Sequence, residues 1–146
     1  MPALLTGGCL CGAIRYTVNA PVATLRACHC TNCQKSSGAA GTVNAVVPSA
    51  SFRITQGTPK RYTTVADSGR TLHRYFCGDC AAPIYSQREV NPEMVSVRAG
   101  GFDNAPEMKI GMHIWTKSAR SWSKLGSVID PAAKQHPGQP DAPTRA

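Results

Sequence analysis

The segment Cys28-His29-Cys30-Thr31-Asn32-Cys33 places three cysteines within six residues, and the shorter runs Cys9-Leu10-Cys11 and Cys77-Gly78-Asp79-Cys80 contain the other four. Cysteines spaced by one or two residues can share one metal ion, and thiolate is a soft ligand that suits zinc. Zinc takes four protein ligands in a structural site, but three ligands and an open position in a catalytic site. Seven cysteines divide naturally into four and three. We expect a structural zinc at Cys9, Cys11, Cys77 and Cys80, and a reactive zinc at Cys28, Cys30 and Cys33.

Disulfides and iron–sulfur clusters are the competing interpretations of these cysteines. Disulfides would leave one of seven thiols unpaired, and they form in oxidising compartments. Residues 1–8 carry no basic segment and too short an apolar run for a signal peptide, so we expect a cytoplasmic protein. An iron–sulfur cluster also uses four thiolates and stays open as an alternative. We expect two zinc ions per chain.

Length and charge restrict the function further. A chain of 146 residues corresponds to one domain by the usual prior, and no run is apolar enough to cross a bilayer. The formal charge is +8; seven thiolates and two Zn²⁺ would lower it to +5. The arginines and lysines are dispersed, whereas a nucleic-acid surface needs them grouped with aromatic residues. We therefore expect neither a nucleic-acid partner nor a membrane partner, and nothing in the sequence predicts an oligomeric state.

Strand patterns outnumber helix patterns. Apolar residues alternate with polar ones in residues 14–18, 52–54, 95–97 and 108–114, and turn-forming residues separate these runs. Many short strands at this spacing predict an antiparallel all-β domain. Helical turns are expected only at Thr31–Ser37 and around Lys117–Lys124. The proline-rich residues 130–146 are predicted to be a disordered tail, and residues 1–129 the zinc domain.

The cysteine motifs resemble those of the glutathione-dependent formaldehyde-activating enzyme family. The resemblance rests on Gly8-Cys9-Leu10-Cys11-Gly12, on residues 28–38 and on Phe76-Cys77-Gly78-Asp79-Cys80, in this order and with matching separations. Residues 57–59, 97–103 and 113–115, with Trp122, extend it, so that the match covers about residues 7–122. Ala81 stands where the family usually has glycine, and Phe102-Asp103-Asn104 replaces a more usual Leu-Asp-Asp. Both departures lie outside the cysteines.

This resemblance implies a β-tent fold and two zinc ions. It implies that Cys9, Cys11, Cys77 and Cys80 bind the structural zinc, and that Cys28, Cys30 and Cys33 bind the catalytic one. The founding activity of the family joins glutathione to formaldehyde and gives S-hydroxymethylglutathione, which is a carbon–sulfur lyase reaction when written in reverse. We therefore expect a lyase that acts on a small thiol, such as glutathione, and an aldehyde, such as formaldehyde.

The chemistry of a three-thiolate zinc agrees with such a reaction. Its net charge of −1 should acidify water less than a three-histidine zinc does, which disfavours hydrolysis. A substrate thiol could instead occupy the fourth position as a thiolate and attack a carbonyl carbon. The charge would then be −2, and a nearby cation or N–H group must offset it. Lys35 and the backbone N–H groups after Cys33 are the nearest candidates.

The remaining polar and aromatic residues carry weaker functional predictions. His29 could be a proton shuttle or an alternative ligand, although we expect its side chain to point away from the metal. His113, Trp115 and Trp122 could line a pocket or pack in the core. His73 is expected to be structural. The alternative function is a non-catalytic, zinc-stabilised binding module similar to centromere protein V, which shares the cysteine motifs; a fourth protein ligand at the triplet would indicate it.

Overall fold

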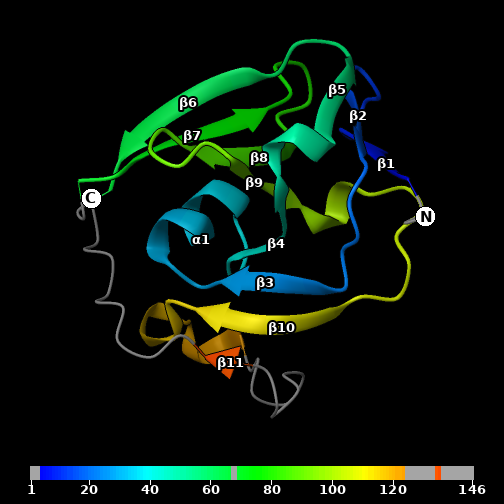
Figure 1. Ribbon diagram of the computed structural model, residues 1–146. Coiled ribbons are helices and arrows are strands. Elements are labelled where there is room, and N and C mark those ends of the chain that lie inside the picture. Colours follow the sequence, from blue (N-terminus) through cyan, green and yellow to red (C-terminus); the bar gives the residue numbers. More distant parts are fainter. Residues whose placement is uncertain (1–3, 67–68, 124–133, 136–146) are drawn as a thin grey trace. The chain divides into compact units, whose positions relative to one another are not determined.

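Short β-strands form most of the regular structure (Figure 1), in a computed structural model that describes residues 4–66, 69–123 and 134–135. The elements are β1 (Leu5–Gly8), β2 (Arg15–Val18), β3 (Thr24–Cys28), α1 (Thr31–Ser37), β4 (Thr42–Pro48), β5 (Phe52–Gln56), β6 (Lys60–Val65), β7 (Thr71–Phe76), β8 (Pro83–Arg88), β9 (Met94–Arg98), β10 (Lys109–Ile114) and β11 (Lys134–Gln135), with 3₁₀ turns η1 (Ser49–Ser51), η2 (Ala99–Gly101), η3 (Thr116–Ser118) and η4 (Ser121–Ser123). The predicted all-β class is confirmed, and α1 has the predicted bounds. The helical turn expected around Lys117–Lys124 consists of the short turns η3 and η4.

The chain divides into two compact units. The first contains Met1–Val22 and Ala45–Glu107, and the second contains Ala23–Asn44 and Met108–Ala146. Strand β4 contributes its first three residues to the second unit and its remainder to the first. Apart from Lys134 and Gln135 in β11, the predicted tail of residues 130–146 lies outside the described residues, and its disorder stays a prediction.

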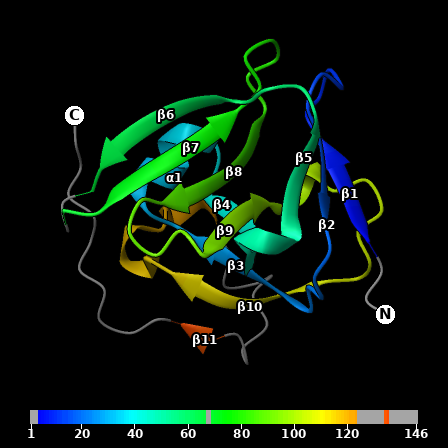
Figure 2. The ribbon, with the colours of Figure 1, turned by 45° about the horizontal axis from the view of Figure 1, so that its top comes forward.

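The first unit consists of antiparallel strands. Strand β2 pairs with both β1 and β5, and β6, β7, β8 and β9 pair in succession. Figure 2 shows β6, β7 and β8 side by side. As the alternating pattern predicts, Tyr16 and Val18 of β2 and Val95 and Val97 of β9 are buried, while the residues between them are partly exposed. Their burial supplies much of the hydrophobic stabilisation of this unit.

Tyr16 and the backbone of Gly101 leave no room for a side chain at Gly7. The ring of Tyr16 packs against Phe52 and Phe102, with ring centroids 5.4 and 6.0 Å apart. A Cβ atom at Gly7 would lie 2.4 Å from the Tyr16 hydroxyl and 2.5 Å from the carbonyl oxygen of Gly101. Glycine is therefore required at position 7, which lies in β1 two residues before Cys9.

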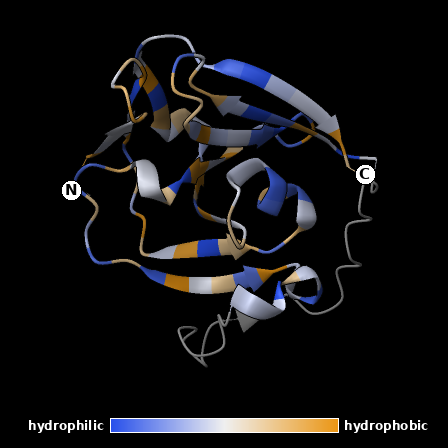
Figure 3. Cartoon of the chain, turned by 180° about the vertical axis from the view of Figure 1, so that it is seen from behind, coloured by the Kyte–Doolittle hydropathy of each residue, from blue (hydrophilic) through white to orange (hydrophobic). Residues whose placement is uncertain are grey.

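The second unit carries the cysteine triplet. Strand β3 pairs antiparallel with the first residues of β4 and parallel with β10, and β11 also pairs parallel with β10. The expected antiparallel arrangement is therefore wrong at β10. Parallel neighbours need a long connection, and the paired residues of β10 and β3 lie more than eighty positions apart in the chain. Figure 3 shows hydrophilic residues set between hydrophobic ones in β3 and β10.

The alternating pattern of residues 108–114 correctly predicts a strand, but it predicts the wrong side chains to be buried. Ile110, Met112 and Ile114 are only partly buried, whereas the side chain of His113 is fully buried. The register shifts between Ile110 and Met112, where Gly111 lies against Thr24. A buried histidine needs a hydrogen-bonding partner, and an apolar pattern cannot reveal one.

No helix among the described residues is long and apolar enough to span a membrane.

Candidate metal centres

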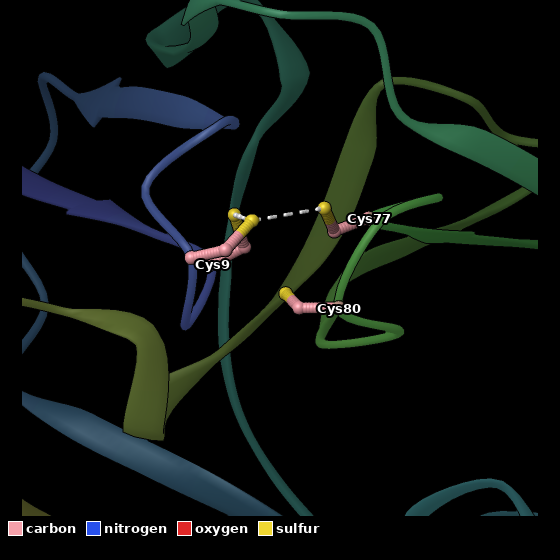
Figure 4. Close-up of side chains that lie close together, drawn as sticks. Cys9, Cys77 and Cys80 are labelled. Atoms are coloured by element: carbon pink, nitrogen blue, oxygen red, sulfur yellow. Dashed lines mark hydrogen bonds between the residues drawn. The ribbon is translucent and has the colours of Figure 1, made fainter.

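The first unit brings Cys9, Cys11, Cys77 and Cys80 together. Their sulfur atoms all lie within 4.8 Å of one another, and Figure 4 shows those of Cys9, Cys77 and Cys80 facing a common space. The Cys9 and Cys11 sulfurs are 3.6 Å apart, and those of Cys11 and Cys77 are 3.8 Å apart. A tetrahedral zinc with Zn–S bonds of about 2.3 Å separates its sulfurs by roughly 3.8 Å. The donor set and its spacing therefore fit zinc.

Two tight turns present these four cysteines. After β1 the chain turns back through Gly12, which has a left-handed φ of 80°, and the backbone N–H of Ile14 donates to the Cys9 sulfur over 3.2 Å. After β7 the backbone N–H of Ala81 donates to the carbonyl oxygen of Cys77 over 3.0 Å. N–H donation to sulfur favours the thiolate, which is the form that binds metal.

The local environment distinguishes the thiols of this group. Backbone N–H groups of Ala82 and Cys11 lower the pKa of Cys80 to about 6, so that this thiol ionises readily. In Cys11 the backbone of Ala13 lowers the pKa, but hydrogen bonding with Cys9 and the other sulfurs outweighs it, and the pKa is raised to about 12. Adjacent thiols resist simultaneous ionisation because the resulting charges repel, and a divalent cation relieves this repulsion.

The second unit brings Cys28, Cys30 and Cys33 together in a buried cluster. Cys28 ends β3, Cys30 is the N-cap of α1, and Cys33 lies in the first turn of that helix. The three sulfurs lie within 4.8 Å of one another, and the backbone N–H of Cys33 donates to the Cys30 sulfur over 3.3 Å. Hydrogen bonding with Cys30 and Cys33, and then burial, raise the pKa of the Cys28 thiol. The soft, closely spaced donors fit a divalent zinc ion.

This triplet has no fourth side-chain ligand within the part of the chain that the structure describes. No His, Asp, Glu or further Cys of residues 4–66 or 69–123 joins its group of three sulfurs. Ile114 and Trp115 pack against the cluster instead. Trp115 has φ 59° and ψ 39°, a left-handed conformation that is rare for so bulky a residue. Strain of this kind concentrates at functional sites.

His29 bonds to another histidine. Its Nε2 atom lies 3.0 Å from Nδ1 of His113, and both side chains are buried. Burial lowers the pKa of both rings, and the neighbouring imidazole lowers that of His29 further, which favours the neutral form of each ring. In this arrangement one ring donates and the other accepts. His29 does not join the sulfur group.

Gln34 connects α1 to the segment after β10. The sequence alone did not predict a role for this residue. Its buried side-chain amide donates to the carbonyl oxygens of His29, over 2.7 Å, and Ser118, over 2.8 Å. Its Oε1 accepts a hydrogen bond of 2.6 Å from Nε of Arg120. The only signal in the sequence was a polar residue directly after Cys33, where α1 has its buried face.

The other predicted residues lie in different surroundings. Lys35 is exposed in the last turn of α1, and Trp122 is exposed as well. His73 lies in β7, where its Nδ1 atom is 2.9 Å from the hydroxyl of Thr63 and its Nε2 atom 3.9 Å from Glu89. These contacts with neighbouring side chains agree with the structural role expected for His73.

A family model described as glutathione-dependent formaldehyde-activating enzyme matches residues 4–118. The two cysteine groups, one in the turns after β1 and β7 and one at the end of β3 and the start of α1, agree with that match. The chain belongs to this family. A Halomonas elongata protein named "Putative glutathione-dependent formaldehyde-activating enzyme" is 27% identical over 129 residues, which cover 85% of this chain and 82% of that protein. A Penicillium rubens protein with the same name is 32% identical over 81 residues, or 56% of this chain.

The match covers only part of some relatives. It spans 41% of the Penicillium protein and 46% of a Sordaria macrospora protein of the same name, which is 29% identical over 110 residues. Among solved structures, a crystal structure of a Rhodobacter sphaeroides protein superposes with a TM-score of 0.57 at 22% identity, covering 72% of this chain and 98% of that one. This likeness supports the fold.

Proposed function

We propose that the protein is a zinc-dependent carbon–sulfur lyase that joins a small thiol, such as glutathione, to an aldehyde, such as formaldehyde. Cys28, Cys30 and Cys33 hold the catalytic zinc in this proposal, and Cys9, Cys11, Cys77 and Cys80 hold the structural zinc. The observation that carries the proposal is the triplet's lack of a fourth protein ligand among the described residues, because a structural zinc site is normally closed by four. Membership of the family supports the choice of thiol and aldehyde.

The reaction is an addition without redox change. The thiol sulfur forms a bond to the aldehyde carbon, the C=O π bond breaks, and the proton lost by the thiol is returned to the former carbonyl oxygen. The product is a hydroxymethyl thioether, and the reverse reaction releases thiol and aldehyde. Zinc bound at the triplet would supply a position at which a thiol is stable as its thiolate near neutral pH.

Other residues of the second unit position the triplet and surround it. The N–H of Cys33 holds the Cys30 sulfur in place, and Gln34 ties α1 to the carbonyl oxygen of His29. Ile114 and Trp115 shield one side of the cluster from water, which strengthens electrostatic interactions there. Lys35 remains the candidate for a cation that offsets the growing negative charge. A reducing cytoplasm, where we place the protein, would keep these thiols unoxidised.

The test is thiol–aldehyde exchange measured with the zinc-loaded protein. Two-dimensional exchange NMR with ¹³C-formaldehyde and glutathione should show interconversion faster than in buffer, and the Cys30→Ser variant should lose the acceleration. Binding of glutathione should also weaken below neutral pH, because the thiol then keeps its proton. If no thiol among glutathione, cysteine and coenzyme A binds or exchanges, the zinc-stabilised binding module becomes the better assignment.

A further inference from the structure

Arg120 is held in a defined orientation by Gln34, the residue that follows Cys33 of the triplet. Gln34 follows Cys33 directly, and both N–H groups of its amide are used by carbonyl oxygens, those of His29 and Ser118. Their acceptors fix which end of the amide is oxygen, so Oε1 faces Arg120 and accepts its Nε–H over 2.6 Å. The backbone carbonyl of Arg120 accepts from the N–H and hydroxyl of Ser123. Both the main chain and the guanidinium of Arg120 are thereby anchored.

The residue that carries this guanidinium is open to solvent. Arg120 is exposed, and the ion pairs of the described residues, Arg15–Asp103 and His73–Glu89, do not involve it. A guanidinium has five N–H groups, and only the Nε–H of Arg120 is engaged by Gln34. The Nη pair of an arginine matches the two oxygens of a carboxylate, and Lys35 and Lys117 provide further positive charge from the same unit.

A solvated surface arginine would be the ordinary interpretation. Here, however, the buried amide of Gln34 accepts a hydrogen bond from the guanidinium of Arg120. Holding the guanidinium in advance reduces the side-chain entropy that binding would otherwise cost. We propose that Arg120 binds a carboxylate of the thiol substrate and that the protein selects carboxylate-bearing thiols over neutral ones. This inference rests on the proposed function and adds the residue that recognises the carboxylate of the thiol.

Two thiols that differ only in a carboxylate provide the test. N-acetylcysteine carries the group and N-acetylcysteamine lacks it. Calorimetry with the zinc-loaded full chain should show that the wild type binds N-acetylcysteine and glutathione more tightly than N-acetylcysteamine. In Arg120→Gln, affinity for the two carboxylate-bearing thiols should fall about 10- to 100-fold, because a charged hydrogen-bonded pair is lost. Affinity for N-acetylcysteamine should stay within about twofold.

Two variants serve as controls. Arg120→Lys keeps the charge but not the paired donors, and it should lose part of the preference. Arg61→Gln removes an exposed arginine of β6 and should leave all three affinities unchanged. Equal affinity of the wild type for the two acetylated thiols, or an equal loss for both in Arg120→Gln, would overturn the carboxylate assignment and leave the proposed function standing. A wild type that binds none of the thiols would overturn the proposed function and this inference together.

Discussion

Ala81, which directly follows Cys80, shows how a single residue can carry backbone strain. Its φ of 62° lies in the left-handed region, which costs a non-glycine residue about 1 kcal/mol or more. The family usually has glycine at this position, and the backbone angle explains that preference. Ala81→Gly should therefore raise the free energy of unfolding by up to about 1 kcal/mol, despite the greater entropy of the unfolded glycine chain.

Thermal unfolding of the zinc-loaded protein would measure this effect, with an expected rise of roughly 3 °C. Ala82→Gly is the matched control, because Ala82 is not among the positive-φ residues and should lose stability from the same substitution. A decrease of similar size in both variants would mean that the Ala81 turn is unstrained.

The two cysteine groups should respond differently to loss of one ligand. Cys77 is fully buried and belongs to the group that joins the turn after β1 to the turn after β7. Cys77→Ser should therefore unfold or aggregate the protein, since structural zinc contributes directly to folding. Cys30→Ser should leave a folded protein with one zinc and no thiol binding. Circular dichroism melts and elemental analysis of the two variants would compare them; equal losses of stability would contradict the division into structural and catalytic sites.

Helix α1 is short, and its N-terminal turn positions two of the three cysteines of the triplet, Cys30 and Cys33. Cys30 caps its N-terminus through its sulfur, and Gly38 ends it with a left-handed φ of 68° while its N–H donates to the Gln34 carbonyl over 2.8 Å. A helix of seven residues has little intrinsic stability, so its caps and its packing decide whether it forms.

Gly38→Ala should consequently destabilise the protein by about 1 kcal/mol, because alanine strains the left-handed C-cap although no atom lies within 4 Å to obstruct its methyl group. Gly38→Asn should cost less. Gly100→Ala is the control, since that position is equally open and does not have a positive φ. Urea titration would measure the differences, and indistinguishable Gly38→Ala and Gly100→Ala variants would show that the cap contributes nothing.

The elements also show what a sequence can reveal. Residues 31–37 were predictable as a helix and residues 14–18 as a strand, because their local patterns match their surroundings. The parallel pairing of β10 with β3 was not, since it joins segments far apart in the chain. The same limit applies to the candidate site. Spacing alone grouped the seven cysteines, whereas the contacts of His113, Gln34 and Arg120 depend on tertiary packing that no local motif encodes.

At the scale of the whole molecule, the cysteine groups belong to different units. The four-cysteine group uses residues of the first unit only, and the triplet uses residues of the second unit only. A metal at each site would therefore cross-link different segments of the chain, and we expect the loss of one metal not to depend on the loss of the other. This division supplies a physical reason for expecting independent loss of the two metals, and the difference in ligand number is the reason for expecting one to be lost before the other.

The purified protein should contain two zinc ions per chain, and a mild chelator should remove one much faster than the other. Four thiolates enclose a metal, whereas three leave an accessible position through which a chelator can attack. After the first zinc is removed, far-UV circular dichroism should be nearly unchanged while glutathione binding is lost; removal of the second should abolish the folded signal. Cys30→Ser, which we expect to retain only the durable zinc, should show the slow phase alone. A stoichiometry of one, two metals lost at the same rate, or a coloured protein containing iron and sulfide would each contradict the division into a closed and an open zinc site.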